Sequence, residues 1–129
     1  MPVRPDLVFI SSSHNYFDMQ PSTYVTTVTQ FVDALRARYS DVPVALSSQN
    51  PRYSPAPYIR EHLARLVQLR ILALQKGWGY LPVTESFQIQ ADGGRSLVHA
   101  DGIHPIAGGS ALWGQVATAY LRSKSLIPS

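Results

Sequence analysis

Three short apolar runs recur along the chain and limit what it can fold into. They cover residues 6–10, 42–46 and 79–83, and are rich in valine, leucine, isoleucine and aromatic residues. Apolar residues follow one another in these runs with little of the alternation of a half-exposed strand, which is typical of strands buried on both faces of a parallel sheet. The sequence therefore predicts three short parallel strands.

Longer segments with helical spacing separate these runs. Segment 21–40 starts at Pro21, a favoured first residue of a helix, and its apolar residues recur every three or four positions. Segment 58–76 repeats this spacing and precedes Gly77, a favourable C-cap, and segment 110–121 is a third amphipathic helix. The alternation predicts an α/β domain of three layers, with a short parallel sheet joined by right-handed crossovers.

Composition excludes several classes of protein. A chain of 129 residues with 45% hydrophobic and 15% charged residues is one globular domain, 1–129. It has no cysteine, which excludes disulfides and cysteine-based zinc sites. No run approaches the ~18 apolar residues of a membrane span, and the N-terminus lacks a signal-peptide pattern, so we expect a soluble protein of undetermined compartment. The net charge of +3 comes from scattered arginines, which does not favour a nucleic-acid partner.

Polar residues follow the first two predicted strands, over residues 11–15 and 47–51. Because open α/β sheets bind ligands at the carboxyl ends of their strands, we expect the functional site at this edge.

An acid and a base lie three residues apart near the C-terminus, in Asp101-Gly102-Ile103-His104-Pro105. Gly102 gives the turn backbone freedom, and Pro105 fixes φ directly after the histidine. The Asp101 carboxylate can then accept from Nδ1–H of His104 and leave Nε2 as a general base.

This block resembles the last conserved block of the SGNH (GDSL-type) ester hydrolases, in which Asp-x-x-His-Pro carries the acid and base of a serine triad. Ser13-His14-Asn15 is similar to the family's Gly-x-Asn-Asp block, with Ser13 at the glycine and Tyr16 at the aspartate. The resemblance implies a flavodoxin-like SGNH fold, with His104 as base, Asp101 as its partner and Asn15 as an oxyanion donor. It also implies an ester or acetylated-sugar substrate and no cofactor.

Three further residues near these motifs are candidates for substrate binding, namely His14, Ser13 and His99. His62, within the second predicted helix, is expected at the surface, as are the arginines.

The family's nucleophile block, Gly-Asp-Ser, does not occur in the 129 residues. Since the family's strand order is 2-1-3-4-5, the first strand here corresponds to the third, and the edge of the sheet beside it would be open. We therefore expect the nucleophile on a missing segment or a complementing polypeptide, or else a chain that self-associates.

Other interpretations stay open at this point. One is a non-catalytic structural or glycan-binding module that keeps the fold. Another is a metal held by His99, Asp101 and His104. A third places the nucleophile on a strand-end serine of this chain, and a fourth pairs Glu85 with Asp92 as in glycosidases. The candidate serines are Ser11, Ser12, Ser13, Ser47 and Ser48.

Overall fold

The computed structural model describes residues 3–16 and 18–129, and its elements alternate as an α/β domain requires. The strands are β1 (Val8–Ser11), β2 (Val44–Ser47) and β3 (Gly79–Leu81). The helices are α1 (Pro21–Arg38), α2 (Ala56–Lys76), α3 (Val83–Gln88) and α4 (Ala107–Ser123), with the 3-10 segments η1 (His14–Tyr16) and η2 (Ala91–Leu97). All three strands are parallel in the order β1-β2-β3, which confirms the predicted parallel α/β sheet.

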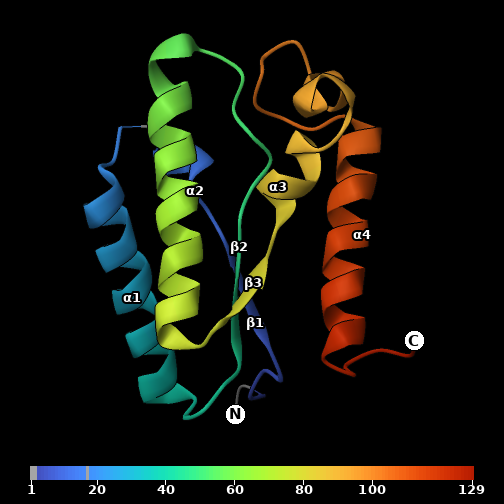
Figure 1. Cartoon of the computed structure of the whole chain (residues 1–129). Helices are drawn as coiled ribbons and strands as arrows, with labels where there is room; N and C mark the ends of the chain where they lie inside the picture. The colour runs from blue at the N-terminus through green and yellow to red at the C-terminus, as the bar shows by residue number, and fades with distance from the viewer. Residues whose placement is uncertain (1–2, 17) are drawn as a thin grey trace.

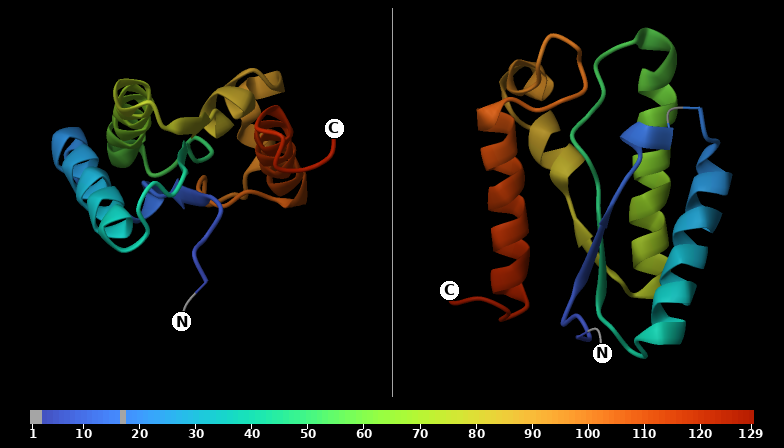
Figure 2. Two further views of the ribbon diagram at one scale, coloured as in Figure 1. Left: turned by 90° about the horizontal axis from the view of Figure 1, so that it is seen from below. Right: turned by 180° about the vertical axis from the view of Figure 1, so that it is seen from behind.

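The sheet lies between two helical layers (Figure 1; Figure 2, left). On one face, α1 and α2 bury a core centred on Tyr24, Val32 and Leu69. On the other, α3, η2 and α4 cover a second core that includes Phe87 and Leu81. The layers bring the carboxyl ends of the strands to the same edge as the segment that precedes α4. In the described part of the chain, no helix combines the length and apolarity needed to cross a bilayer.

Helix and strand boundaries differ from the predicted ones where proline or glycine intervenes. The predicted third strand ends at Leu81, because Pro82 cannot donate to the ladder, and Val83 instead begins the helix α3. Gly77 does cap α2, with a left-handed φ of 67°. α4 begins at Ala107 rather than Ser110, so Gly109 lies inside its first turn. A Cβ on Gly109 would lie 2.3 Å from the Leu97 carbonyl oxygen, so this glycine allows a close approach between backbones.

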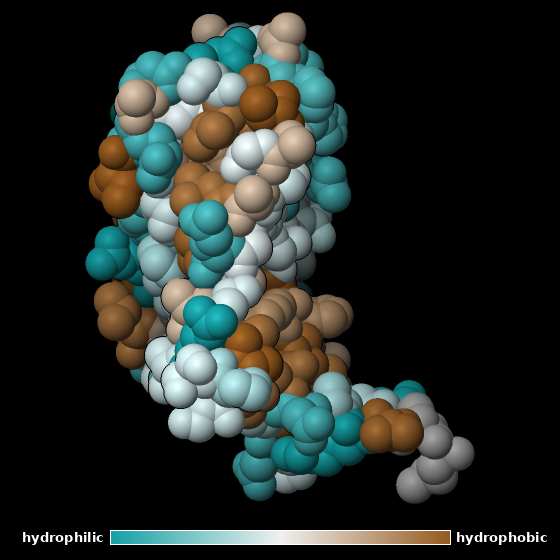
Figure 3. Space-filling view, turned by 90° about the vertical axis from the view of Figure 1, so that its right-hand side faces the viewer, coloured by the Kyte–Doolittle hydropathy of each residue, from teal (hydrophilic) through white to brown (hydrophobic). Residues whose placement is uncertain are grey.

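The strand β1 is an edge strand whose composition is that of an interior strand. It pairs with β2 alone among the described strands, and it is nearest the viewer in the right panel of Figure 2. Phe9 is 40% exposed. One side of β1 adjoins a groove lined by Ile10, Ser12, Tyr16, Tyr24, Thr27, Val28 and Phe31, and the other a hollow lined by Asp6, Leu7, Phe9, Leu121 and Leu126. Figure 3, which looks onto the α4 side, shows apolar surface gathered in a hollow near the lower end of the molecule.

Candidate active site

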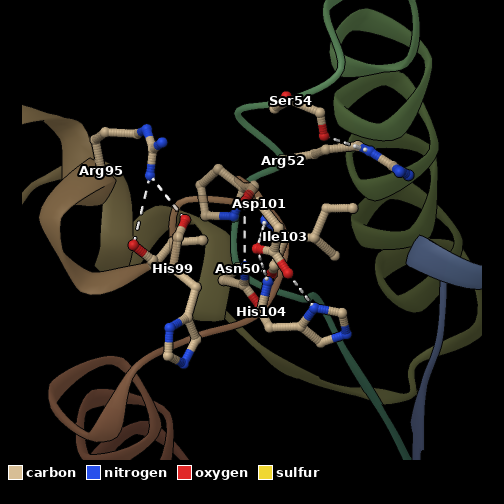
Figure 4. A network of polar contacts seen from close by, with 10 residues as sticks. Asn50, Arg52, Ser54, Arg95, His99, Asp101, Ile103 and His104 are labelled. Atoms are coloured by element: carbon tan, nitrogen blue, oxygen red, sulfur yellow. Dashed lines mark hydrogen bonds and ion pairs between the residues drawn. The ribbon is translucent and has the colours of Figure 1, made fainter.

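Asp101 and His104 form the predicted pair at the strand-end edge (Figure 4). Nδ1–H of His104 donates to Asp101 Oδ2 over 2.6 Å. The other carboxylate oxygen accepts from the backbone N–H groups of Ile103, at 2.8 Å, and His104, at 3.1 Å. The His104 side chain is 73% exposed, and its Nε2 bonds to no described residue. The imidazole is therefore oriented by Asp101 and presents Nε2 to solvent, as a general base requires.

The charge on Asp101 is stabilised within the turn itself. The hydrogen bond from His104, followed by those from the two backbone N–H groups, lowers the pKa of Asp101 well below its usual value. Asp101 is thus a carboxylate at any pH at which a histidine base works, and it can stabilise the imidazolium that forms when His104 takes a proton.

The turn is closed at its base and packed against the loop that follows β2. His99 N–H donates to the His104 carbonyl over 2.8 Å, and Tyr53 N–H donates to the Gly102 carbonyl over 2.8 Å. Gly102 has a φ of 73°, and a Cβ there would lie 2.7 Å from the backbone nitrogen of Ser54. This position therefore needs glycine for both its conformation and its contact.

Ser13 lies at the glycine position of the Gly-x-Asn pattern, and its backbone conformation explains why the pattern has glycine there. Its φ of 139° falls in a region that favours glycine. Ser13 is fully buried. Its hydroxyl accepts from Arg65 Nε over 3.0 Å and lies 3.1 Å from His62 Nδ1, while its carbonyl accepts from Arg65. These contacts hold the backbone in place and leave Ser13 out of reach of a substrate.

Asn15 and His14 follow on the short η1 segment. Asn15 is exposed, its side chain bonds to no described residue, and it follows the carboxyl end of β1. The His14 ring stacks on His62 at 4.2 Å between centroids, and its Nε2 lies 3.1 Å from the Asn50 carbonyl oxygen. Burial, then the charge of Arg52, lowers the pKa of His14 to about 4, and His104 adds a smaller effect. His14 and Ile103 both contact Asn50, so the two motifs lie close together at this edge of the sheet.

His99 is exposed, and its ring points away from the Asp101–His104 pair (Figure 4). Within the part of the chain that the structure describes, no group of three His, Cys, Asp or Glu residues is arranged to hold a metal. Glu85, a candidate carboxylate of the glycosidase interpretation, accepts from the Tyr80 hydroxyl over 2.7 Å and pairs with Arg70 at 3.6 Å.

The strand-end serines are engaged elsewhere, apart from the exposed Ser11. Ser47 and Ser48 are buried and donate to backbone carbonyls, and Ser12 bonds with Tyr24. None of the described serines is hydrogen-bonded to His104.

Several residues of the site were not predicted from the sequence. His62 and Arg65 were expected at the surface, but they are 1% and 0% exposed. That expectation was wrong because Arg65 finds carbonyl and hydroxyl acceptors inside the protein, which offsets the cost of burial. Asn50 is also buried, and its side chain donates to the Ile103 carbonyl over 2.8 Å. The only sequence signal for Asn50 was its place in the polar strand end 47–51.

No protein-family model and no curated protein matches the sequence. Solved structures do match the fold. A GDSL-like lipase from Parabacteroides merdae aligns with a TM-score of 0.73 at 13% identity, over 96% of this chain and 62% of the other. The lipase/acylhydrolase from Enterococcus faecalis gives 0.73 at 14% identity, over 93% and 63%. LAE5, an alpha/beta hydrolase enzyme from the metagenome of Lake Arreo, Spain, gives 0.68 at 18%, over 91% and 60%.

The fold is therefore that of the GDSL-like (SGNH-type) hydrolases, as the two motifs implied. The chain spans between 60% and 63% of the length of these structures.

Proposed function

We propose that this chain supplies the base, its carboxylate partner and an oxyanion donor to a serine ester hydrolase. The observation that carries the proposal is the 2.6 Å bond between His104 Nδ1 and Asp101 Oδ2, with Nε2 of the same ring open to solvent. Asn15 lies at the same edge of the sheet, and its amide bonds to none of the described residues. An oriented imidazole and an amide donor are two of the groups that acyl transfer requires.

In the proposed reaction, His104 Nε2 takes the proton of a serine hydroxyl as its oxygen attacks the ester carbonyl. The negative charge that develops on the carbonyl oxygen accepts a hydrogen bond from the Asn15 amide. The imidazolium, stabilised by Asp101, then gives its proton to the departing alcohol, which leaves an acyl-enzyme. A water molecule repeats these steps, releases the acid and returns the proton to serine. No cofactor enters this sequence.

The nucleophilic serine belongs, in this proposal, to a segment or a complementing polypeptide outside the 129 residues. Two observations support it: none of the described serines bonds to His104, and the chain spans about three fifths of the structures it matches. The free edge of β1 is where that polypeptide would pair. Because the surfaces on both sides of β1 are apolar, the arriving strand should be apolar on both faces, as in an extended parallel sheet.

The proposed substrate is an ester of a small acyl group, such as an acetylated sugar. The test is hydrolysis of p-nitrophenyl acetate and of a peracetylated glucose by the protein isolated from its native host with any bound polypeptide. We expect His104→Ala to lower kcat by about 10³-fold or more. Asp33→Asn, on the exposed face of α1, serves as the control and should leave the rate unchanged. An unchanged rate in His104→Ala would overturn the proposal.

The alternative is a structural or glycan-binding module that keeps the fold without ester chemistry. None of the described serines is hydrogen-bonded to His104, and this observation favours the non-catalytic alternative. An assembly that binds acetylated glycans but hydrolyses neither substrate would support this alternative.

A further inference from the structure

Asn50 is the residue that touches both halves of the candidate site. It is 1% exposed, in the loop between β2 and α2. Its Nδ2 donates to the Ile103 carbonyl, one residue before His104, over 2.8 Å. The backbone carbonyl oxygen of Asn50 lies 3.1 Å from Nε2 of His14 and 3.2 Å from Nε2 of His62. One buried residue thus joins the two halves: its side chain reaches the Asp101–His104 turn (Figure 4), and its backbone carbonyl reaches His14, next to Asn15.

The protons around Asn50 can be assigned from the chemistry of its neighbours. A carbonyl oxygen only accepts, so both histidines donate from Nε2 to Asn50. Nδ1 of His62 is then an acceptor and receives the Ser13 hydroxyl proton over 3.1 Å. The Ser13 oxygen in turn accepts from Arg65 Nε over 3.0 Å. The result is one continuous order of donors and acceptors, from Arg65 through Ser13 and His62 to Asn50.

The Asp101–His104 turn depends on outside contacts because its own side chains are exposed, at 44% for Asp101 and 73% for His104. Packing therefore does little to fix the His104 ring, and its position follows the backbone of the turn. Among the described hydrogen bonds, Asn50 is the one side chain outside the turn that donates to residues 101–104. The Ile103 N–H, on the same residue, donates to Asp101. A shift of Ile103 would therefore move the carboxylate as well as the histidine.

We propose that Asn50 is a positioning residue for His104: it fixes the carbonyl of Ile103 and so sets the Asp101–His104 pair relative to the segment that carries Asn15. The catalytic meaning of this role rests on the proposed ester hydrolysis, whereas the geometry can be tested on the chain itself.

The experiment compares Asn50→Asp with Gln49→Glu by NMR of the full chain. Asn50→Asp keeps the shape of the side chain but turns an oxygen toward the Ile103 carbonyl, and the two oxygens repel each other. Gln49→Glu adds the same charge one residue away and keeps the Oε1 that accepts from His14 N–H over 2.7 Å. It is thus a matched control for charge.

We expect a downfield His104 Nδ1–H signal in the wild type, because this proton is held by a carboxylate. The signal should broaden or disappear in Asn50→Asp and persist in Gln49→Glu. In the active assembly, Asn50→Asp should lower kcat by about 10- to 100-fold while KM changes less than about twofold, since orientation rather than binding is lost. An unchanged Nδ1–H signal in Asn50→Asp would overturn the positioning role.

A measurement on the wild type keeps the proposal testable if Asn50→Asp does not fold. The Asn50 side-chain amide protons should exchange with water far more slowly than those of the exposed Asn15. Equal exchange rates would overturn the proposal. If Asn50→Asp loses the His104 Nδ1–H signal but the wild-type assembly has no esterase activity, the positioning role of Asn50 is supported. Only the proposed function is then contradicted.

Discussion

The two halves of the candidate site are built in opposite ways. The Asp101–His104 turn is exposed, and the hydrogen bonds that shape its acid–base pair join residues two or three positions apart. The segment Ser13–Asn15 is held by side chains 35 to 52 positions away, among them Gln49, His62 and Arg65. The His104 ring is thus oriented by short-range hydrogen bonds within a turn that contacts Asn50, whereas the segment that carries Asn15, the proposed oxyanion donor, is placed by distant residues. Perturbations of the fold and of the turn should therefore separate the two.

Lowering the pH should destabilise the buried half of the site, which includes His14 and His62. This should be the largest of the expected effects. Burial, followed by the neighbouring His14, lowers the pKa of His62 to about 3, and that of His14 is lowered to about 4. In the unfolded chain both titrate near 6.5. Between these values the unfolded state binds more protons, so the free energy of unfolding falls as pH drops below 6.5. At about 1.4 kcal/mol per pKa unit, the loss by pH 4 is several kcal/mol.

Urea unfolding at pH 7, 5.5 and 4 measures this loss, with His62→Gln as the comparison. The variant keeps an amide near the Asn50 carbonyl but has no titrating ring. Its unfolding free energy should depend less steeply on pH in this window than that of the wild type. Equal pH dependence in the two proteins would contradict the assigned burial of a neutral His62.

Gly102→Ala should damage the exposed half, and Gly77→Ala is its matched control. Both glycines have left-handed φ values, 73° and 67°, but only Gly102 is packed against the backbone of Ser54, while nothing lies within 4 Å of a Cβ on Gly77. We expect a loss of about 1 kcal/mol for Gly77→Ala, from backbone strain alone, and about 3 kcal/mol for Gly102→Ala. Chemical denaturation measures both, and equal losses would show that the Ser54 contact has no energetic weight.

Ser13→Ala should weaken the buried half with a smaller effect. It removes one acceptor from Arg65 and one donor from His62, and the loss of these two buried hydrogen bonds should cost about 1–3 kcal/mol. Ser40→Ala, at an exposed turn, should stay within about 0.5 kcal/mol. The His104 Nδ1–H signal should survive in Ser13→Ala, because the hydrogen bonds that hold this proton lie within the turn. A loss of unfolding free energy in Ser40→Ala but not in Ser13→Ala would contradict the hydrogen-bond network around Ser13.

The sequence was sufficient for features set by neighbouring residues. Pro21 and Gly77 marked helix ends correctly, and the five residues from Asp101 to Pro105 contained the acid–base pair. The helix α3 was missed because its apolar residues, such as Val83 and Phe87, are too few to show a period and follow a strand-like run. Each of these features depends on a few neighbouring residues. A short stretch of sequence therefore either suffices to predict the feature or misleads, as it does for α3.

The rest depended on which distant residues the fold brings together. Arg65 and His62 are usually surface types, and nothing in α2 alone distinguishes the buried Arg65 from the exposed Arg60 except its place on the inward face. Asn50 gains its role from the carbonyl of Ile103, 53 positions later. Contacts of this range leave no pattern in a single sequence.

Labelling with a fluorophosphonate serine probe, followed by peptide mass spectrometry, tests whether His104 activates a serine outside the 129 residues. The protein is isolated from its native host with any bound polypeptide, as wild type and as His104→Ala. We expect label on a serine outside the 129 residues in the wild type, and loss of that label in His104→Ala. Label on a serine within the 129 residues, or no label in the wild type, would contradict the proposed role of His104 as the base for a serine on another segment.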